Sequence, residues 1–216
     1  MTHMQSSLLN FFDSVIITDC DEILVPDPSE FSTLRDYIDK VDFDYVNAIG
    51  INILHVMHLE GPLEFKAPIL TQRQYGRFNS PCCKQLLSRV PLRWLPGFHS
   101  TDKIPKFDNR LYNFHTKAMD YGIAVARQVV NQETVWSERS LAVKFGDHHR
   151  WNIQKFVHEY FLVPIHIFNE NLFMDFSFED ELTQIKSETI SNGGFFSIPM
   201  NVSKFVKIPP HWSNLI

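Results

Sequence analysis

The chain has few glycines, few cysteines and no excess of basic residues. Its 216 residues include only 8 Gly and 3 Cys, which excludes collagen-like and disulfide-rich folds. Its 20 Lys and Arg residues are outnumbered by 25 Asp and Glu residues, so the formal net charge is −5. This acidic balance disfavours broad nucleic-acid binding, which needs a basic face.

Long apolar runs are also missing. No segment approaches the roughly 20 apolar residues that a membrane span needs. The first twelve residues, MTHMQSSLLNFF, lack the charged and long apolar regions of a signal peptide. Cys20 stands alone and Cys82 adjoins Cys83, so no routine disulfide is expected. We therefore expect a cytoplasmic protein with reduced cysteines, no membrane span and no nucleic-acid partner.

Aromatic residues, in contrast, are abundant. The chain holds 19 Phe, 6 Tyr and 4 Trp, and 44% of its residues are hydrophobic. Aromatic side chains bury large areas, so the core can be sizeable. The length fits one domain, or one domain with a small extension.

Hydrophobic patterning predicts a sheet in the first part of the chain. Residues 14–19 (SVIITD) form a β-branched run without alternation, which is typical of a strand buried on both faces of a parallel sheet. The further strand candidates are 44–56, 83–88, 92–99 and 111–115.

Helices are expected on either side of these strands. They are predicted over 4–12, from a cap at Ser29 to Lys40, over 117–130, and from 137 to 161 with a break at Gly146. Residues 191–216 are rich in Gly and Pro and are expected to form an extended surface arm. We therefore expect an α/β fold with a mixed sheet flanked by helices. Its predicted division is a sheet-containing domain over 1–132 and a C-terminal helical extension and arm over 133–216.

The segment Asp19-Cys20-Asp21-Glu22 is the clearest chemical motif. Parallel strands deliver their last residues to the ligand-binding edge of a sheet. Two close carboxylates repel each other, and a hard divalent cation such as Mn²⁺ or Mg²⁺ relieves that repulsion. Such a cation can also neutralise a departing diphosphate. The same residues are equally compatible with an inert, solvated acidic turn.

Residues 18–26 (TDCDEILVP) resemble the DxD segment of GT-A fold glycosyltransferases, especially family 2-like enzymes. Later stretches agree in order, and the resemblance covers roughly residues 4–130. The matched stretches are the arginine-containing segment 67–73 (APILTQR), the strand starting at 84 (KQLL), the Gly-x-His turn 94–99 (WLPGFH) and the His-containing strand 111–117 (LYNFHTK).

The resemblance implies a GT-A (Rossmann-like) fold and a nucleotide-sugar donor. Asp21 would then be a metal ligand, and Asp19 would contact the ribose or the waters of the metal. His99 or His115 would complete the metal shell, and Arg73 would contact the diphosphate. Arg77 and Lys84 are further cations suited to that role, although surface cations that pair with the acidic excess would look the same.

The resemblance also implies transfer to a hydroxyl acceptor on a glycan, a lipid or a small molecule. A carboxylate would serve as general base in an inverting transfer, and Asp102 and Asp120 are the nearest candidates by position. Only 18 residues precede Asp19, whereas a GT-A domain carries a nucleotide-binding half there. We therefore expect a partial GT-A domain, completed by a partner chain or a homodimer, or a catalytically incomplete remnant or binding module.

A third interpretation is a haloacid-dehalogenase-like phosphatase, because residues 15–24 also resemble the first motif of that family. Asp19 would then be the nucleophile and Asp21 the acid/base. Ile23 stands where that family has Thr or Val. No later acidic pair completes its magnesium site.

Overall fold

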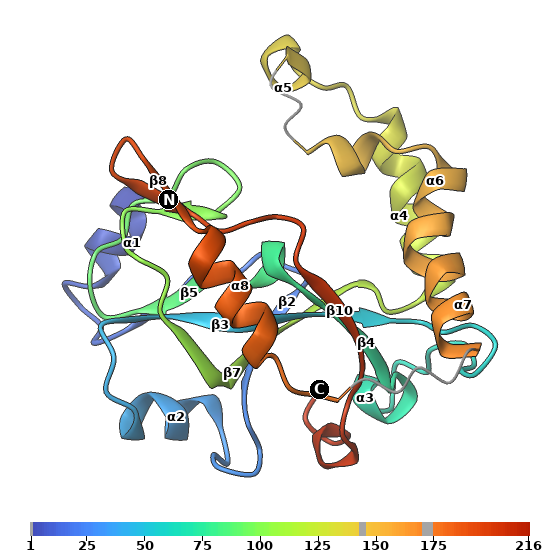
Figure 1. Cartoon of the computed structure of the whole chain (residues 1–216), viewed down its shortest axis with the longest axis horizontal. Helices are drawn as coiled ribbons and strands as arrows, with labels where there is room; N and C mark the ends of the chain where they lie inside the picture. Colours follow the sequence, from blue (N-terminus) through green and yellow to red (C-terminus); the bar gives the residue numbers. More distant parts are fainter. Residues whose placement is uncertain (1, 143–145, 170–174) are drawn as a thin grey trace.

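The chain folds around a curled mixed sheet that is flanked by helices (Figure 1). The computed structural model describes residues 2–142, 146–169 and 175–216. The expectation of an α/β fold with a mixed sheet and flanking helices is confirmed at this level. Within the described ranges, the main sheet has seven strands and a second sheet has three.

Strand β3 (Tyr45–Leu54) is the centre of the main sheet, and all of its ten residues are buried. It pairs in parallel with β7 (Phe107–Ala118) along one edge. Its other edge carries two short antiparallel strands, β5 (Gln85–Ser88) beside the first half and β4 (Tyr75–Asn79) beside the second. The strands predicted over 44–56, 83–88 and 111–115 are thus confirmed in place.

The 3₁₀ turn Ser80–Cys82 joins β4 to β5 and crosses close to β3. A Cβ atom on Gly50 of β3 would lie 2.4 Å from the Cys82 carbonyl carbon, a distance that no side chain tolerates. The backbone N–H of Gly50 also donates to the Cys83 sulfur at 3.2 Å. Glycine at this position therefore lets the turn approach the central strand.

Three outer strands complete the main sheet. β2 (Glu22–Pro26) runs antiparallel to β7, and β10 (Ser203–Lys207) runs antiparallel to β4. β1 (Val15–Ile16) pairs antiparallel with β5 at the sheet edge. The prediction of a strand over 14–19, buried on both faces of a parallel sheet, is wrong. A β-branched run indicates strand tendency, but it does not reveal how many neighbours the strand will have.

The remaining predicted strand, 92–99, is also wrong. In this region only Trp94 makes an isolated bridge, to Thr101 of the two-residue strand β6 (Ser100–Thr101). β6 belongs to the small second sheet, in which β9 (Phe195–Ser197) lies between β6 and β8 (Ile190–Asn192).

Helices α1, α2 and α4 and the helical segments between 138 and 162 lie where the hydrophobic periodicity predicts helix, with shifted ends, whereas α3, α7 and α8 lie outside the predicted ranges. Helix α2 begins later than expected, because Thr33 rather than Ser29 caps it by accepting from the Asp36 N–H. The helical bounds are α1 Thr2–Leu8, α2 Leu34–Lys40, α3 Ile69–Gln72, α4 Tyr121–Glu133, α5 Glu138–Ala142, α6 Ile153–Val157, a π-helix His158–Leu162, α7 Val163–Asn169 and α8 Glu179–Glu188.

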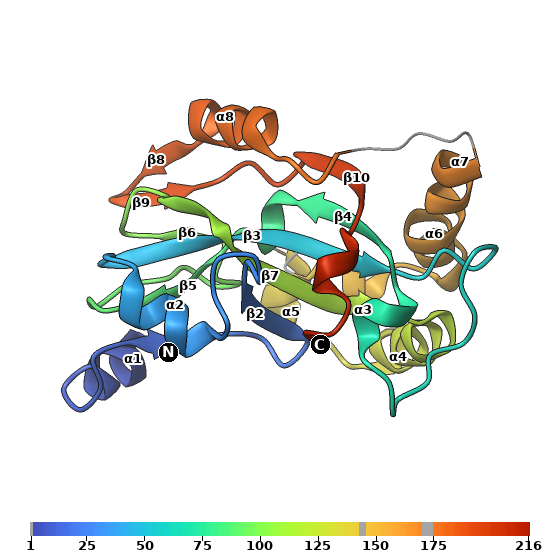
Figure 2. The same cartoon turned by 90° about the horizontal axis from the view of Figure 1, so that it is seen from below.

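Helices α4, α6 and α7 lie together at one end of the molecule in both views; Figure 2 shows them beside the end of the sheet. Phe156 and Phe161 pack there against Leu54 of β3 and Ala118 of β7, and Ala124 of α4 joins the same cluster. Gly146 precedes a 3₁₀ turn and has φ 65°, so the expected helical break occurs there.

The tail after residue 190 is not a surface arm. β10 is hydrogen-bonded into the main sheet, and Val206, Ile208 and Trp212 are buried in the largest hydrophobic cluster. Trp212 packs edge-on against Tyr112, with ring centroids 4.7 Å apart. The Gly and Pro residues that predicted an arm mark turns between these segments instead.

No helix within the described residues is both long and apolar enough to cross a lipid bilayer.

Replacing Trp212 by Ala should test the role of the tail. Trp212 is 1% exposed, and removing a buried Trp costs about 3–5 kcal/mol of unfolding free energy. Met200→Ala, at a tail residue that is 51% exposed, should change it by less than about 0.5 kcal/mol. Urea denaturation measures both values. Equal, small effects of the two substitutions would indicate a loosely attached tail.

Candidate functional site

The acidic turn lies between β1 and β2, with a buried lysine beside it. Lys84 Nζ lies 2.6 Å from Asp19 Oδ2 and 2.8 Å from Glu22 Oε1. The Glu22 side chain is 1% exposed, whereas that of Asp19 is 49% exposed. Burial lowers the pKa of Lys84, but the charges and hydrogen bonds of Glu22 and Asp19 outweigh it and raise the pKa. Lys84 therefore stays charged and fixes the turn.

Asp21 joins a second, separate ion-pair group. Its Oδ2 lies 2.7 Å from Arg127 Nη1 of α4 and 3.5 Å from His115 Nε2 of β7. The hydrogen bond from His115, aided by Arg127, holds the pKa of Asp21 well below its usual range despite burial. Burial lowers the pKa of His115, but Asp21 and Cys82 outweigh it and raise the pKa to about 9. His115 is therefore a cation at neutral pH.

A polar row crosses four strands of the sheet at this point. By strand register, Arg77 of β4 lies opposite Asn52 of β3, which lies opposite His115 of β7, which lies opposite Glu22 of β2. His115 Nδ1 is 2.8 Å from Asn52 Oδ1, and the Cys82 thiol donates to the same oxygen at 3.4 Å. Interior sheet positions are usually apolar, so a buried row of polar side chains marks a candidate site.

Apolar side chains lie next to the polar row along the strands and belong to the hydrophobic core. Ile51, Phe78 and Phe114 alternate with the row residues and belong to the apolar cluster that also holds Trp212. Side chains alternate between the faces of a strand. One face of the sheet is therefore hydrophobic core, and the other presents the polar row.

Lys117 and Arg77 lie at the same end of the sheet, each near the ring of Tyr160. Lys117 Nζ is 5.4 Å from the ring centroid, and Arg77 Cζ is also 5.4 Å from it. Tyr160 comes from the π-helix His158–Leu162. Burial, with the nearby charge of Arg127, lowers the pKa of Lys117 to about 8.

His99 lies near the acidic turn without contacting it directly. Its Nδ1 lies 2.9 Å from the carbonyl oxygen of Pro81. Burial, with the charge of Lys84, lowers the pKa of His99, and Glu22 and Asp19 partly oppose that effect. The structure thus brings His99 into the electrostatic neighbourhood of Asp19, while His115 is the histidine that meets Asp21.

The four residues predicted as metal ligands lie in three separate arrangements. Asp19 pairs with Lys84, Asp21 pairs with Arg127 and His115, and His99 faces a backbone carbonyl. Among the described residues, no group of three or more His, Cys, Asp or Glu side chains is arranged to hold a metal ion. Each carboxylate is already neutralised by a basic side chain, so these residues do not fit a preassembled Mn²⁺ or Mg²⁺ site.

Arg73 and Asp120 lie elsewhere and organise the backbone. Arg73 is fully buried, and its guanidinium donates to the carbonyls of Met119, Gly61 and Gln72. Asp120 Oδ2 lies 3.4 Å from Arg73, and Asp120 Oδ1 caps α4 by accepting from the Ile123 N–H. These contacts leave Arg73 no accessible group for a diphosphate.

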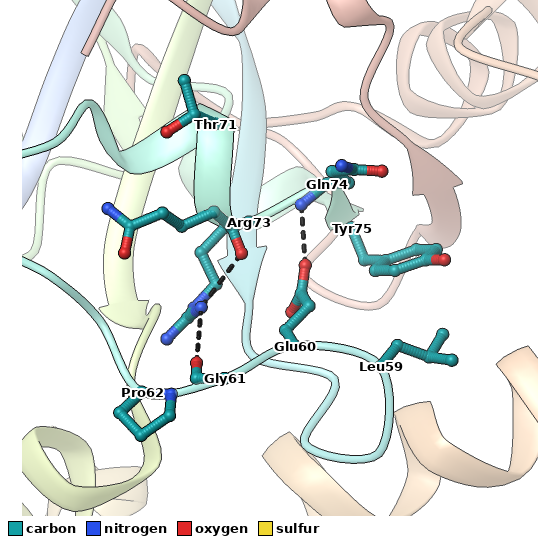
Figure 3. A pocket seen from close by; sticks show the side chains of 9 residues that line it. Leu59, Glu60, Gly61, Pro62, Thr71, Arg73, Gln74 and Tyr75 are labelled. Carbon is teal, nitrogen blue, oxygen red and sulfur yellow. Dashed lines mark hydrogen bonds between the residues drawn. The ribbon is translucent and has the colours of Figure 1, made fainter.

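Figure 3 shows the cavity beside Arg73, which has a volume of about 310 Å³. Glu60 lines it and accepts from the backbone N–H groups of Val56 and Gln74, both at 2.7 Å. Burial raises the pKa of Glu60 to about 7, against the opposing effect of these hydrogen bonds. Glu60 thus joins the two ends of the segment between β3 and β4, and Arg73 binds the Gly61 carbonyl within that segment.

Asp102, the other candidate base, is engaged in a turn. Its two carboxylate oxygens accept from the Arg93 backbone N–H at 2.9 Å and from the Arg93 side chain at 3.1 Å. Within the part of the chain that the structure describes, no hydrogen bond or ion pair joins Asp102 or Asp120 to the acidic turn.

Four residues of the site lie outside the sequence-based candidates: Asn52, Lys117, Arg127 and Tyr160. One of them had a usable signal. Residues 111–118 (LYNFHTKA) place Asn113, His115 and Lys117 at every second position of a strand, which puts them on one face. The other three depend on tertiary contacts that no local pattern reveals.

Comparisons with protein-family models, with curated proteins and with solved structures each found no match. The functional interpretation therefore depends on the residues and geometry described above.

The Asp21–His115 pair should be visible in a histidine titration. Because the folded-state pKa of His115, about 9, exceeds the ordinary value of 6.5, the pair stabilises the fold below about pH 6.5 and loses this contribution as pH rises through about 9. Nuclear magnetic resonance should show His115 titrating near pH 9. In Asp21→Asn its pKa should fall by at least about one unit.

Asp36→Asn is the matched control, because Asp36 pairs with Lys40 on the surface. It should leave the titration of His115 unchanged. A His115 that titrates at its ordinary pH in the unmodified chain would contradict the ion pair.

Proposed function

We propose that the chain binds the diphosphate of a nucleotide-sugar donor beside Asp21 and transfers the sugar to a hydroxyl acceptor. One observation carries the proposal: cations outnumber carboxylates around the buried polar row. The cations are Arg77, Lys84, His115, Lys117 and Arg127, and the carboxylates are Asp19, Asp21 and Glu22.

Arg127 and His115 have the chemistry to hold a diphosphate. Arg127 is 44% exposed, and its planar guanidinium has further N–H groups beyond the one that meets Asp21. His115 is a cation at neutral pH, since its pKa is about 9. Fixed positive charge beside a departing diphosphate stabilises the negative charge that develops on it.

Asp21 keeps these two cations in place. It accepts from Arg127 at 2.7 Å and faces His115 at 3.5 Å, so one carboxylate orients groups from both β7 and α4. Because protein cations occupy the positions around both acids, we assign no step to a metal ion. The order of the matched stretches in the sequence supports the glycosyltransferase class independently of this geometry.

The alternatives have less support. A haloacid-dehalogenase-like phosphatase needs Asp19 after a strand of a parallel sheet, whereas β1 is a two-residue antiparallel edge strand. Asp102 and Asp120 make structural contacts, so neither is assigned as the base. The titrations described next test whether the chain is instead an incomplete remnant that binds no donor.

Calorimetric titration of UDP and of GDP tests the proposal. At least one should bind to the unmodified chain in the presence of EDTA, because the positive charge comes from the protein. Arg127→Gln should weaken that binding about tenfold or more, since a hydrogen bond to a charged group contributes about 1.5–3 kcal/mol. Arg35→Gln, at an exposed residue paired with Asp39, should have no effect.

The same titrations with Mn²⁺ separate the remaining accounts. Binding that requires Mn²⁺ and disappears in Asp21→Ala would support the metal-dependent DxD site and contradict a site made of protein cations. A folded chain that binds neither nucleotide under either condition would contradict donor binding and favour the remnant.

A further inference from the structure

Two cations beneath Tyr160 are the part of the site that the fold leaves unsatisfied. Lys117 Nζ and Arg77 Nε are buried, and neither has a hydrogen-bond partner among the residues that the structure describes. Lys117 is only 9% exposed. A buried charge without a partner is strongly unfavourable, and Lys117 is in that position. Arg77 is half-buried, and its Nε is the atom that lies buried without a partner.

The residues around Lys117 supply little negative charge. Lys117 is influenced by Arg127 of α4, Asp21 of the acidic turn and Cys82 of the 3₁₀ turn. His148 and His149 lie near Lys117, and burial, with the charge of Lys117, lowers the pKa of each. The pKa of His148 falls to about 3, so this side chain is neutral. Asp21, already paired with Arg127, is the carboxylate that acts on Lys117, and Glu159 acts on the neighbouring Tyr160.

The ring of Tyr160 covers both cations. It contacts them through its face, at 5.4 Å in each case, which compensates only part of the lost hydration. Tyr160 belongs to a π-helix, a rare element that often occurs at functional sites. Phe205 also lies 5.7 Å from Arg77 Cζ, and Phe156 lies 6.0 Å from Lys117 Nζ. The geometry therefore presents two cations from β4 and β7 that share the Tyr160 ring and have no hydrogen-bond partner for a buried nitrogen among the described residues.

We propose that Arg77 and Lys117 form a phosphate-binding subsite, and that the Tyr160 ring moves aside when the phosphate enters. A phosphate group carries negative charge and several acceptor oxygens. It would supply the hydrogen-bond acceptors that Lys117 Nζ and Arg77 Nε lack among the described residues. The source of the phosphate rests on the proposed function: it would be the donor diphosphate or a phosphorylated acceptor. The subsite itself does not depend on it.

Titration with sodium phosphate, with sodium pyrophosphate and with UDP tests the subsite, in the presence of EDTA. At least one of the two inorganic anions should bind to the unmodified chain. Lys117→Met and Arg77→Met should each weaken that binding tenfold or more. Lys106→Met, at an exposed lysine over the Tyr45 ring, should leave it unchanged.

Stability provides a second readout that a purely structural lysine would not give. Lys117→Met removes an unpaired buried charge and keeps most of the side-chain volume. It should therefore raise the melting temperature while it weakens anion binding. A lower melting temperature with unchanged anion binding would overturn the subsite, as would a chain to which neither phosphate nor pyrophosphate binds.

The UDP arm identifies the source of the phosphate. If Lys117→Met weakens both UDP and pyrophosphate, the subsite holds the donor diphosphate. If it weakens inorganic phosphate but not UDP, the subsite holds a phosphate of the acceptor. Binding of the inorganic anions without any binding of UDP or GDP would support the subsite and contradict the proposed function, so the two failures are distinguishable.

Discussion

The buried polar row across the sheet is the constraint on which the site depends. Asn52, near the C-terminal end of β3, meets both His115 and Cys82, and these contacts satisfy groups that would otherwise be buried without partners. Gly50 makes this arrangement feasible, because it lets the turn that carries Cys82 cross β3 closely. A polar interior of this kind is stable only when its members hold one another in place.

The opposite face of the sheet is apolar, and its burial stabilises a fold that also contains this polar interior. Trp212 and α8 cover that face with a continuous aromatic and aliphatic cluster, and β10 extends the sheet beside Arg77. Chain segments after residue 175 thus support the face of the sheet opposite the candidate site. Arg127 of α4 and Tyr160 of the π-helix add to the residues that the strands bring to this site.

Local patterns predicted the coarse fold class and several of the residues that meet in the candidate site. The strands around 44–56 and 111–115 were predictable because long apolar runs dominate their environment. The paired roles of Asp19 and Asp21 were not, since Lys84 and Arg127 lie 65 and 106 residues away in sequence. The tail was mispredicted because Gly and Pro mark turns but do not reveal what the segments between them cover. Arg73 looked like a phosphate ligand, although its buried guanidinium serves three backbone carbonyls.

Backbone amide resonances followed during addition of UDP in EDTA test most directly whether the cations around Asp21 hold a diphosphate. We expect shifts at residues 19–22, 82–84, 115–117 and 127, and none at the Glu60–Arg73 cavity. Shifts confined to that cavity, or no shifts at any UDP concentration that leaves the chain folded, would contradict diphosphate binding by these cations.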